Sequence, residues 1–404
     1  MYDAIVIGAR CAGASTAMLL GRRGHKVLLV DRDTFPSDIP HGHFIHRHGP
    51  QRLHRWGLLD QIVASGCPGV RSITSDVGDF PLVSNDLEVD GVAVGYGPRR
   101  AVLDHILVEA AIAAGVELRT GFAVESFETD NGRITGIRGR DRTSGAAVTE
   151  HAAVTIGADG RNSRLARFVG APTYEATPAV TCWYFGYWSG VPATGLEIYV
   201  RQDRVIFVFP TNDGLFGVFV AWPRAELAVV RADIEGQFLL ALDRVPELAA
   251  RVRAGRREER FYGASDLPNF LRRPFGPGWA LVGDAGCHKD PFLALGVCDA
   301  MRDAELLTEA LDNGFTGRQH LDAAMADYER QRNEATLPEY HQNLALARFE
   351  PPPPMFGQLR AALRGNDEAT KQFFLANEGL IPREVFFNPE NLARVMGTAI
   401  ADGR

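Results

Sequence analysis

A short glycine-containing turn between an apolar run and a helical pattern constrains this chain more than any other feature. The turn lies within YDAIVIGARCAGASTAMLLGRRGHKVLLVD, residues 2–31. Residues 2–7 are a short run with β-branched side chains, residues 13–23 are apolar at helical spacing, and residues 26–30 form a second buried run. This order predicts one βαβ unit that ends at Asp31.

The turn from Gly8 to Gly13 follows the first predicted strand and opens the helix, as a dinucleotide-binding fingerprint requires. A backbone without Cβ atoms lets pyrophosphate oxygens meet free N–H groups at the positive end of the helix. A carboxylate at Asp31 can accept hydrogen bonds from ribose hydroxyls. The middle glycine of the fingerprint is Arg10, whose side chain must point away from the pyrophosphate or lie beside a phosphate. A tight turn without a ligand is the alternative interpretation.

Composition narrows the class of partner. The 404 residues carry a net charge of −7 with acids and bases interspersed, so there is no basic stripe for a nucleic acid or a membrane surface. We expect a small-molecule partner and two packed regions. The odd, scattered cysteines indicate reduced thiols in the cytosol, and we find neither a signal peptide nor an apolar run that spans a bilayer. Monomer and homodimer both stay open.

Four histidines crowd into the turn-rich stretch after Asp31. His41, His43, His46 and His48 are a candidate metal site, but no carboxylate or cysteine accompanies them at a familiar ligand spacing. A loop that lines a ligand pocket, or a plain surface loop, is the favoured interpretation. We therefore expect no bound metal.

An apolar strand runs into small residues and a carboxylate at two later places. In VTIGADGRNSRLAR, residues 154–167, Asp159 stands at a strand end before a helix that begins near Ser163, where a capping role is the alternative. In WALVGDAGCHKDPFLALGVCDAMRDAELLTEAL, residues 279–311, Asp284 stands at a strand end and a helix starts near Gly296. The N-terminus of that helix favours a negative group.

The middle of the chain predicts a β-sheet with aromatic side chains on both faces. Alternation between residues 180 and 222 puts Trp183, Phe185 and Tyr187 on one face, and Tyr184 and Trp188 on the other. One face can meet a helix and the other a ligand, while ordinary core packing is the alternative for each ring.

A small antiparallel sheet is predicted over residues 116–155, and helices over residues 51–64, 103–115, 234–252 and 321–347, with small helices beyond 354.

Three separated signals stand in the order of one family: the turn with Asp31, the Gly157-Ala158-Asp159-Gly160 stretch, and Gly283-Asp284 before Pro291 and Gly296. Up to about residue 311 the chain resembles the single-component, FAD-containing aromatic hydroxylases of the para-hydroxybenzoate hydroxylase type. The wider group includes geranylgeranyl reductases and flavin halogenases. The resemblance implies an α/β fold with a Rossmann-like FAD-binding βαβ domain, a mixed or antiparallel β-sheet substrate domain and a helical C-terminal segment. The implied division is 1–75, 99–171 and 275–318 for FAD, 76–98 and 172–274 for substrate, and 319–404 for the C-terminal segment.

The resemblance also implies roles for residues. The turn and Asp31 would hold the pyrophosphate and adenosine ribose, Arg100 would reach the phosphates, and Asp159 would serve both FAD and NAD(P)H. Asp284 would bind the ribityl chain, and the helix at Gly296 would stabilise the negative charge of reduced flavin. The full predicted cofactor set is Gly8, Arg10, Cys11, Ala12, Gly13, Asp31, Arg32, Arg100, Asp159, Gly160, Gly283, Asp284, Pro291, Gly296 and Val297.

The chain departs from the family pattern at two further positions. The asparagine expected after the helix-opening glycine is Cys298, and a glycine expected between Pro291 and Gly296 is Leu293. These changes affect the predicted shape of the flavin pocket rather than the prediction of FAD binding.

The implied activity is a monooxygenase. NAD(P)H would reduce FAD, O₂ would add at the flavin C4a, and the hydroperoxide would pass one oxygen to an aromatic or polycyclic substrate under the aromatic strands. Reduction of a prenyl-type double bond is the alternative. A halogenase is disfavoured because Lys289 is the only candidate for its lysine and the tryptophan-x-tryptophan signature is missing. A non-catalytic flavin carrier is disfavoured too.

Candidate acid–base residues, each with a structural alternative, are His43, His46, Tyr184, His288 and Lys289.

Overall fold

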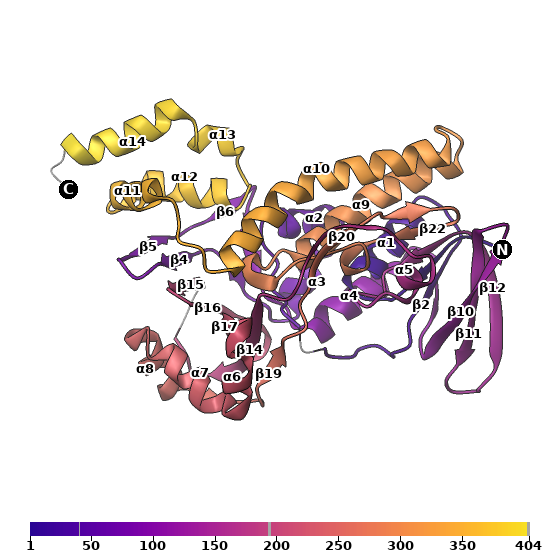
Figure 1. The fold of residues 1–404 in the computed structure, drawn as a ribbon, viewed down its shortest axis with the longest axis horizontal. Coiled ribbons are helices and arrows are strands. Elements are labelled where there is room, and N and C mark those ends of the chain that lie inside the picture. Colours follow the sequence, from indigo (N-terminus) through magenta and orange to yellow (C-terminus); the bar gives the residue numbers. More distant parts are fainter. Residues whose placement is uncertain (40, 193–194, 402–404) are drawn as a thin grey trace. The chain divides into compact units, whose positions relative to one another are not determined.

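The computed structural model describes residues 1–39, 41–192 and 195–401, and the chain divides into two compact units (Figure 1). Unit 1 comprises Met1–His43, Arg99–Pro178 and Leu267–Leu344, and unit 2 comprises Phe44–Pro98, Ala179–Asp266 and Ala345–Arg404. Relative to the predicted division, residues 44–75 and 345–404 cluster with unit 2, and residues 172–178, 267–274 and 319–344 cluster with unit 1. None of the helices in the described part of the chain has the length and apolar content needed to cross a bilayer.

A parallel sheet forms the centre of unit 1. β1 (Tyr2–Ile7) lies between β2 (Val27–Val30) and β12 (Ala147–Gly157), and all three are parallel. β22 (Trp279–Leu281) extends the sheet beside β12, and β9 (Glu117–Arg119) extends it beside β2, again in parallel. The predicted βαβ unit is confirmed, with α1 (Cys11–Arg22) between β1 and β2. The carboxyl ends of these strands therefore meet at one edge of the sheet.

The predicted antiparallel sheet joins the parallel one through a shared strand. β10 (Phe122–Asp130) and β11 (Arg133–Asp141) form a hairpin, and β11 pairs in antiparallel fashion with β12. The hairpin turn places Asn131 at φ 48° and Gly132 at φ 80°, the left-handed conformations that a two-residue turn of this kind needs. β12 is thus long enough to serve both sheets.

Helices and a second small sheet complete unit 1. α1 contacts both α4 (Arg100–Ala113) and α9 (Gly296–Phe315). The predicted long helix is confirmed as α10 (Leu321–Ala347), which accommodates Pro338 in its interior. The remaining elements of unit 1 are α5 (Arg164–Phe168), β21 (Phe275–Gly276), and a three-stranded sheet of β13 (Thr173–Thr177), β20 (Asn269–Arg272) and β23 (Cys287–His288).

Unit 2 is built on a sheet that is antiparallel except for the β15–β4 pair. The strands predicted between residues 180 and 222 are all present. The sheet order is β18 (Arg256–Arg257), β14 (Thr181–Ser189), β17 (Phe216–Pro223), β16 (Arg204–Pro210), β15 (Leu196–Arg201), β4 (Ile73–Asp76) and β5 (Pro81–Ser84), with β19 (Tyr262–Ala264) beside β14. Short pairs join β3 (Gly69–Val70) to β8 (Gly95–Tyr96), and β6 (Glu88–Val89) to β7 (Val92–Ala93).

The two faces of this sheet carry different aromatic sets. Tyr184 and Trp188 pack in one buried cluster with Trp222 and with Phe238 of the neighbouring helices. This confirms the prediction that one face meets helices. The covering helices are α6 (Leu227–Ala232), α7 (Ile234–Leu242) and α8 (Pro246–Ala254).

On the opposite face the rings stack on one another along the sheet. Trp183 stacks on Phe207 with ring centroids 5.9 Å apart, and Phe185 stacks on Phe219 at 4.5 Å. Phe209 stacks on Phe219 at 5.1 Å and so lengthens the row. We call these five residues the aromatic row.

Two predicted helices are each split. The helix predicted over residues 51–64 is divided into α2 (Gly49–Arg55) and α3 (Leu59–Ala64), because Gly57 between them adopts φ 72°. The helix predicted over residues 234–252 is divided into α7 and α8. Pro246 starts α8, since its ring cannot continue the preceding helix.

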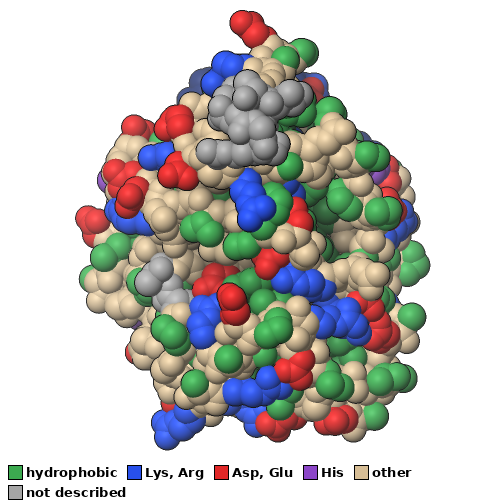
Figure 2. Space-filling view, turned by 90° about the vertical axis from the view of Figure 1, so that its left-hand side faces the viewer, with side chains coloured by type: hydrophobic (Ala, Val, Ile, Leu, Met, Phe, Trp, Pro, Cys, Tyr) green, Lys and Arg blue, Asp and Glu red, His purple; other side chains and the backbone are tan. Residues whose placement is uncertain are grey.

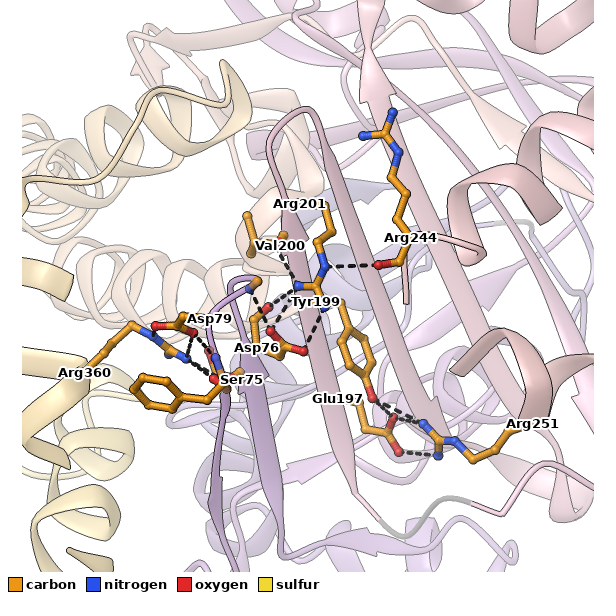
Figure 3. Close-up of polar contacts among 12 residues, drawn as sticks. Ser75, Asp76, Asp79, Glu197, Tyr199, Val200, Arg201, Arg244, Arg251 and Arg360 are labelled. Carbon is orange, nitrogen blue, oxygen red and sulfur yellow. Dashed lines mark hydrogen bonds and ion pairs between the residues drawn. The ribbon is translucent and has the colours of Figure 1, made fainter. Parts of the chain in front are cut away.

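The C-terminal part of unit 2 is helical, as predicted, and one buried arginine ties it to the β4–β5 hairpin. Its helices are α11 (Pro354–Leu363), α12 (Asp367–Asn377), α13 (Arg383–Phe386) and α14 (Pro389–Ala401), and residues 402–404 lie outside the described residues. Arg360 is 1% exposed and donates to both carboxylate oxygens of Asp79 at 3.0 and 2.8 Å, and to the Phe80 carbonyl at 2.5 Å (Figure 3). Figure 3 also shows Arg201 paired with Asp76 in the same hairpin.

Charged side chains of both signs are interspersed on the face drawn in Figure 2. This agrees with the mixed charge pattern of the sequence.

Replacing Arg360 with Met should lower the free energy of unfolding by about 2–3 kcal/mol at pH 7, since charged hydrogen bonds are lost. Burial opposes ionisation of Asp79, but Arg360 outweighs it and holds the pKa of Asp79 below 3.8. A carboxyl group with a lower pKa in the folded state stabilises the fold at pH values above its unfolded pKa. This stabilisation is lost as the pH falls through the folded-state pKa. Urea unfolding should therefore show a smaller difference between variant and parent at pH 3.

The matched control is Arg256→Met, which removes an arginine whose side chain is 80% exposed in its pair with Glu258. Its effect should be near zero because exposed pairs contribute little. Equal losses in the two variants would contradict the anchoring role of Arg360.

Candidate functional site

The loops that follow the parallel strands of unit 1 bring the predicted cofactor residues to one edge of the sheet. Gly8 follows β1, Asp31 follows β2, Asp159 follows β12, and Gly283 follows β22. These four strands are consecutive neighbours, in the order β22-β12-β1-β2. The carboxyl edge of an open parallel sheet is where such folds bind ligands.

Close backbone packing fixes the dinucleotide turn. A Cβ added to Gly13 would lie 1.7 Å from the Gly8 carbonyl oxygen, and a Cβ on Gly8 would lie 2.5 Å from the Ala158 carbonyl oxygen. A Cβ on Gly283 would lie 2.7 Å from the Cβ of Ala12. The three sequence signals are therefore in direct contact around the start of α1.

The Asp31 carboxylate, predicted to hold a ribose, is tied to the neighbouring backbone. Its Oδ2 accepts from the Ala9 N–H at 2.7 Å and its Oδ1 accepts from the Asp33 N–H at 2.8 Å. Burial raises its pKa, against these two hydrogen bonds. Each carboxylate oxygen can accept a further hydrogen bond, so two vicinal hydroxyls could be held here.

Arg100 and Arg10 share one carboxylate that the sequence prediction missed. Asp104 is fully buried and accepts from Arg100 at 3.0 Å, from Arg10 at 2.9 Å, and from the Cys11 thiol at 3.3 Å. The spacing of Arg100 and Asp104, four residues apart on a helix, was the available signal. Arg10 is also paired with Asp33, so two carboxylates balance the two guanidinium groups beside the turn.

Within the described residues the Asp159 carboxylate is only partly hydrogen-bonded. Asp159 Oδ2 accepts from the Arg164 N–H at 2.7 Å, yet its Oδ1 is buried without a hydrogen-bond partner. A Cβ on Gly160 or on Gly296 would meet nothing within 4 Å. Gly296 opens the 20-residue helix α9, whose N-terminus carries the positive end of the helix dipole.

His41 follows the segment after β2. Although His41 is an exposed residue, the protein around it and the charges of Arg100 and Arg161 lower its pKa to about 4, and Asp284 only partly opposes them. His41 is consequently neutral at neutral pH.

Two of the candidate acid–base residues are engaged inside unit 1. His288 is hydrogen-bonded through Nδ1 to the Pro268 carbonyl, and Lys289 is paired with Asp299 at 2.7 Å and Glu339 at 3.7 Å. The Lys289 side chain is only 5% exposed. Lys289 thus contacts α9 and α10, and His288 is held by the residue before β20.

The other three candidates belong to different parts of the chain. Tyr184 lies on the helix-covered face of the unit 2 sheet. His43 is buried in unit 1, while His46 of unit 2 is hydrogen-bonded to Glu378 at 2.6 Å. The Glu378 partner could not be found from sequence, since it lies 332 residues away.

The sequence pattern described as FAD binding domain matches residues 1–336. The chain belongs to this FAD-binding family. The digeranylgeranylglycerophospholipid reductase of Methanothrix thermoacetophila is 26% identical over 366 residues, which cover 86% of this chain and 87% of the reductase. The 1H-pyrrole-2-carbonyl-[peptidyl-carrier protein] brominase of Pseudoalteromonas luteoviolacea is 24% identical over 332 residues, 78% of each chain.

Solved structures share the fold. The myxobacterial chondrochloren halogenase CndH superimposes with a TM-score of 0.78 at 21% identity, covering 99% of this chain and 97% of the other. PqsL from Pseudomonas aeruginosa, described as a probable FAD-dependent monooxygenase, gives 0.73 at 23% identity, covering 86% and 95%. At these identities the similarity concerns the fold alone.

The residues of unit 1 fit FAD. The turn and α1 would bind the pyrophosphate, and Asp31 would bind the adenosine ribose. The carboxylates of Asp159 and Asp284 would accept hydrogen bonds from the cofactor. When bound, FAD would supply the redox chemistry. The protein contributes the binding, the orientation and the electrostatic field.

Replacing Asp31 with Asn should weaken FAD binding about 10- to 100-fold, because charged hydrogen bonds to the ribose are lost. Titration of the apoprotein with FAD, followed by flavin fluorescence, measures the change. Asp130→Asn at the β10–β11 hairpin is the control and should bind like the parent. Parent-like affinity in Asp31→Asn would contradict this role.

Proposed function

We propose that the protein is an FAD-dependent monooxygenase that uses NAD(P)H and O₂ to hydroxylate an aromatic or polycyclic small molecule. The observation that carries the proposal is the aromatic row of unit 2. Its rings stack at 4.5–5.9 Å along one sheet face. A flat aromatic substrate can extend such a stack, because offset stacking is favourable between planar rings.

The aromatic row also fits the need to exclude water. It consists of Trp183, Phe185, Phe207, Phe209 and Phe219, none of which carries a charge. Dry surroundings favour transfer of oxygen to the substrate over release of hydrogen peroxide. In the proposed reaction this chain's residues bind and orient the substrate, and no protein base is required.

Lys289 argues against a halogenase. The amine of such an enzyme must be accessible and nucleophilic, whereas Lys289 is buried and paired with Asp299 and Glu339. Those carboxylates raise its pKa against the effect of burial, so the amine stays protonated. Halogenation is therefore not proposed.

Reduction of a prenyl-type double bond is the second candidate. It is favoured by the similarity to the Methanothrix reductase, which extends over 86% of this chain. A flexible aliphatic chain gains less than a flat ring from stacking on the aromatic row. For that reason we place reduction second.

The deciding experiment measures NAD(P)H oxidation and O₂ uptake by the FAD-loaded protein with a panel of phenolic and polycyclic compounds. We expect some of these compounds to stimulate both rates and to gain one oxygen atom, as detected by mass spectrometry. Turnover of a prenyl substrate without O₂ uptake would instead support the reductase. A halide-dependent product would contradict both.

A matched pair of variants tests the substrate face. Phe207 is half-buried in the aromatic row, and Phe261 is half-buried against the helix-covered face. Phe207→Leu should raise KM for an aromatic substrate about 3- to 10-fold, the value of one ring pair. Phe261→Leu should leave KM unchanged, and equal KM values in the two variants would contradict the assignment.

A further inference from the structure

The side chain of Arg10, which replaces the middle glycine of the fingerprint, connects three elements of unit 1. Arg10 is the N-cap residue of α1. Its Nη1 donates to Asp104 of α4 at 2.9 Å, and its Nη2 donates to Asp33 at 3.1 Å and to the Ser37 hydroxyl at 2.9 Å. The guanidinium carbon lies 5.4 Å from the ring centroid of Phe35. One side chain thus ties the turn to α4 and to the segment after β2.

Both ends of this connection adjoin residues predicted to touch the adenosine diphosphate half of FAD. Asp33 donates its N–H to Asp31, the predicted ribose ligand. Asp104 holds Arg100, the predicted phosphate ligand. Arg10 therefore encloses the region where the ribose and the pyrophosphate are expected.

The connection is more than a surface ion pair. The Arg10 side chain is 19% exposed, and the Asp104 side chain is fully buried. Charged hydrogen bonds in partly buried positions contribute more than exposed ones, and the forked guanidinium fixes two partners at once. The segment after β2 is accordingly held in a defined place before any ligand arrives.

We propose that Arg10 is a positioning residue that holds the segment after β2 against the dinucleotide turn and thereby slows the release of FAD. A bound dinucleotide leaves when the segment beside its ribose moves away, so each hydrogen bond from Arg10 to that segment adds to the barrier for dissociation. Preorganised sites differ from loose ones mostly in dissociation rate. The proposal rests on membership of the FAD-binding family and is independent of the reaction proposed above.

The test measures the rate of FAD release from the FAD-loaded protein, followed by the flavin fluorescence that appears after dilution. Arg10→Met keeps an unbranched apolar stem and removes the guanidinium group, so release should become about 10- to 100-fold faster. Arg22→Met makes the same change at the exposed end of α1 and should release FAD at the parent rate. No substrate or NAD(P)H is needed.

Further variants distinguish a specific effect of the Arg10 contacts on FAD release from a general loss of folding stability. Asp33→Asn should speed release by a smaller factor, and adding it to Arg10→Met should cause little further change because both act through one contact. Arg10→Lys keeps the charge without the fork and should restore part of the slow release.

Parent-like release from both Arg10→Met and Asp33→Asn would overturn the proposal, and so would fully additive effects in the double variant. If Arg10→Met does not fold, Asp33→Asn and Ser37→Ala carry the test, since both leave the Arg10–Asp104 pair in place. Parent-like release from these two variants would likewise overturn it.

Discussion

The contact between Gly8 and Gly13 is the constraint on which the cofactor edge of this protein depends. The helix can begin directly above the first strand only because Gly13 has no side chain, since a Cβ there would lie 1.7 Å from the Gly8 carbonyl oxygen. The tight turn aims the positive end of α1 at the carboxyl edge of the sheet. It also leaves room for Ala12 to meet Gly283, which brings the Asp284 loop to the same place.

Buried charges are arranged around this edge in matched groups. Asp104 balances the guanidinium groups of Arg10 and Arg100, while Lys289 and Arg302 share Asp299. Buried ions need such partners because leaving water is costly. The first group lies beside the dinucleotide turn, where Arg10 is paired with Asp33 as well, whereas the second joins α9 to the segment before it. The same physical rule thus applies both next to the predicted cofactor residues and in the supporting part of the fold.

Much of this arrangement was predictable from sequence because its signals are local. The β1–α1–β2 order, the strand ends at Asp159 and Asp284, and the alternation along β14 all follow from short-range periodicity. The family resemblance supplied the step from separate strand ends to one FAD site. Gly57 also gave a readable signal, yet the predicted helix ran through it.

Other features could not be read from local patterns. Neither residue periodicity nor spacing indicates that Glu378 meets His46, or that Arg360 lies against Asp79. These contacts join positions hundreds of residues apart and are decided by packing. The role of Arg10 was open in the sequence for the same reason, since its partners Asp104 and Ser37 lie on other elements.

The way the chain passes between its two units has a consequence for biosynthesis. Each unit consists of three separate segments, and the chain crosses from one unit to the other at residues 44, 99, 179, 267 and 345. On the ribosome, β12 must wait for β22, more than a hundred residues later, before the parallel sheet of unit 1 is complete. Both units are therefore completed late in synthesis, and unpaired strand edges, which favour aggregation, stay exposed until then.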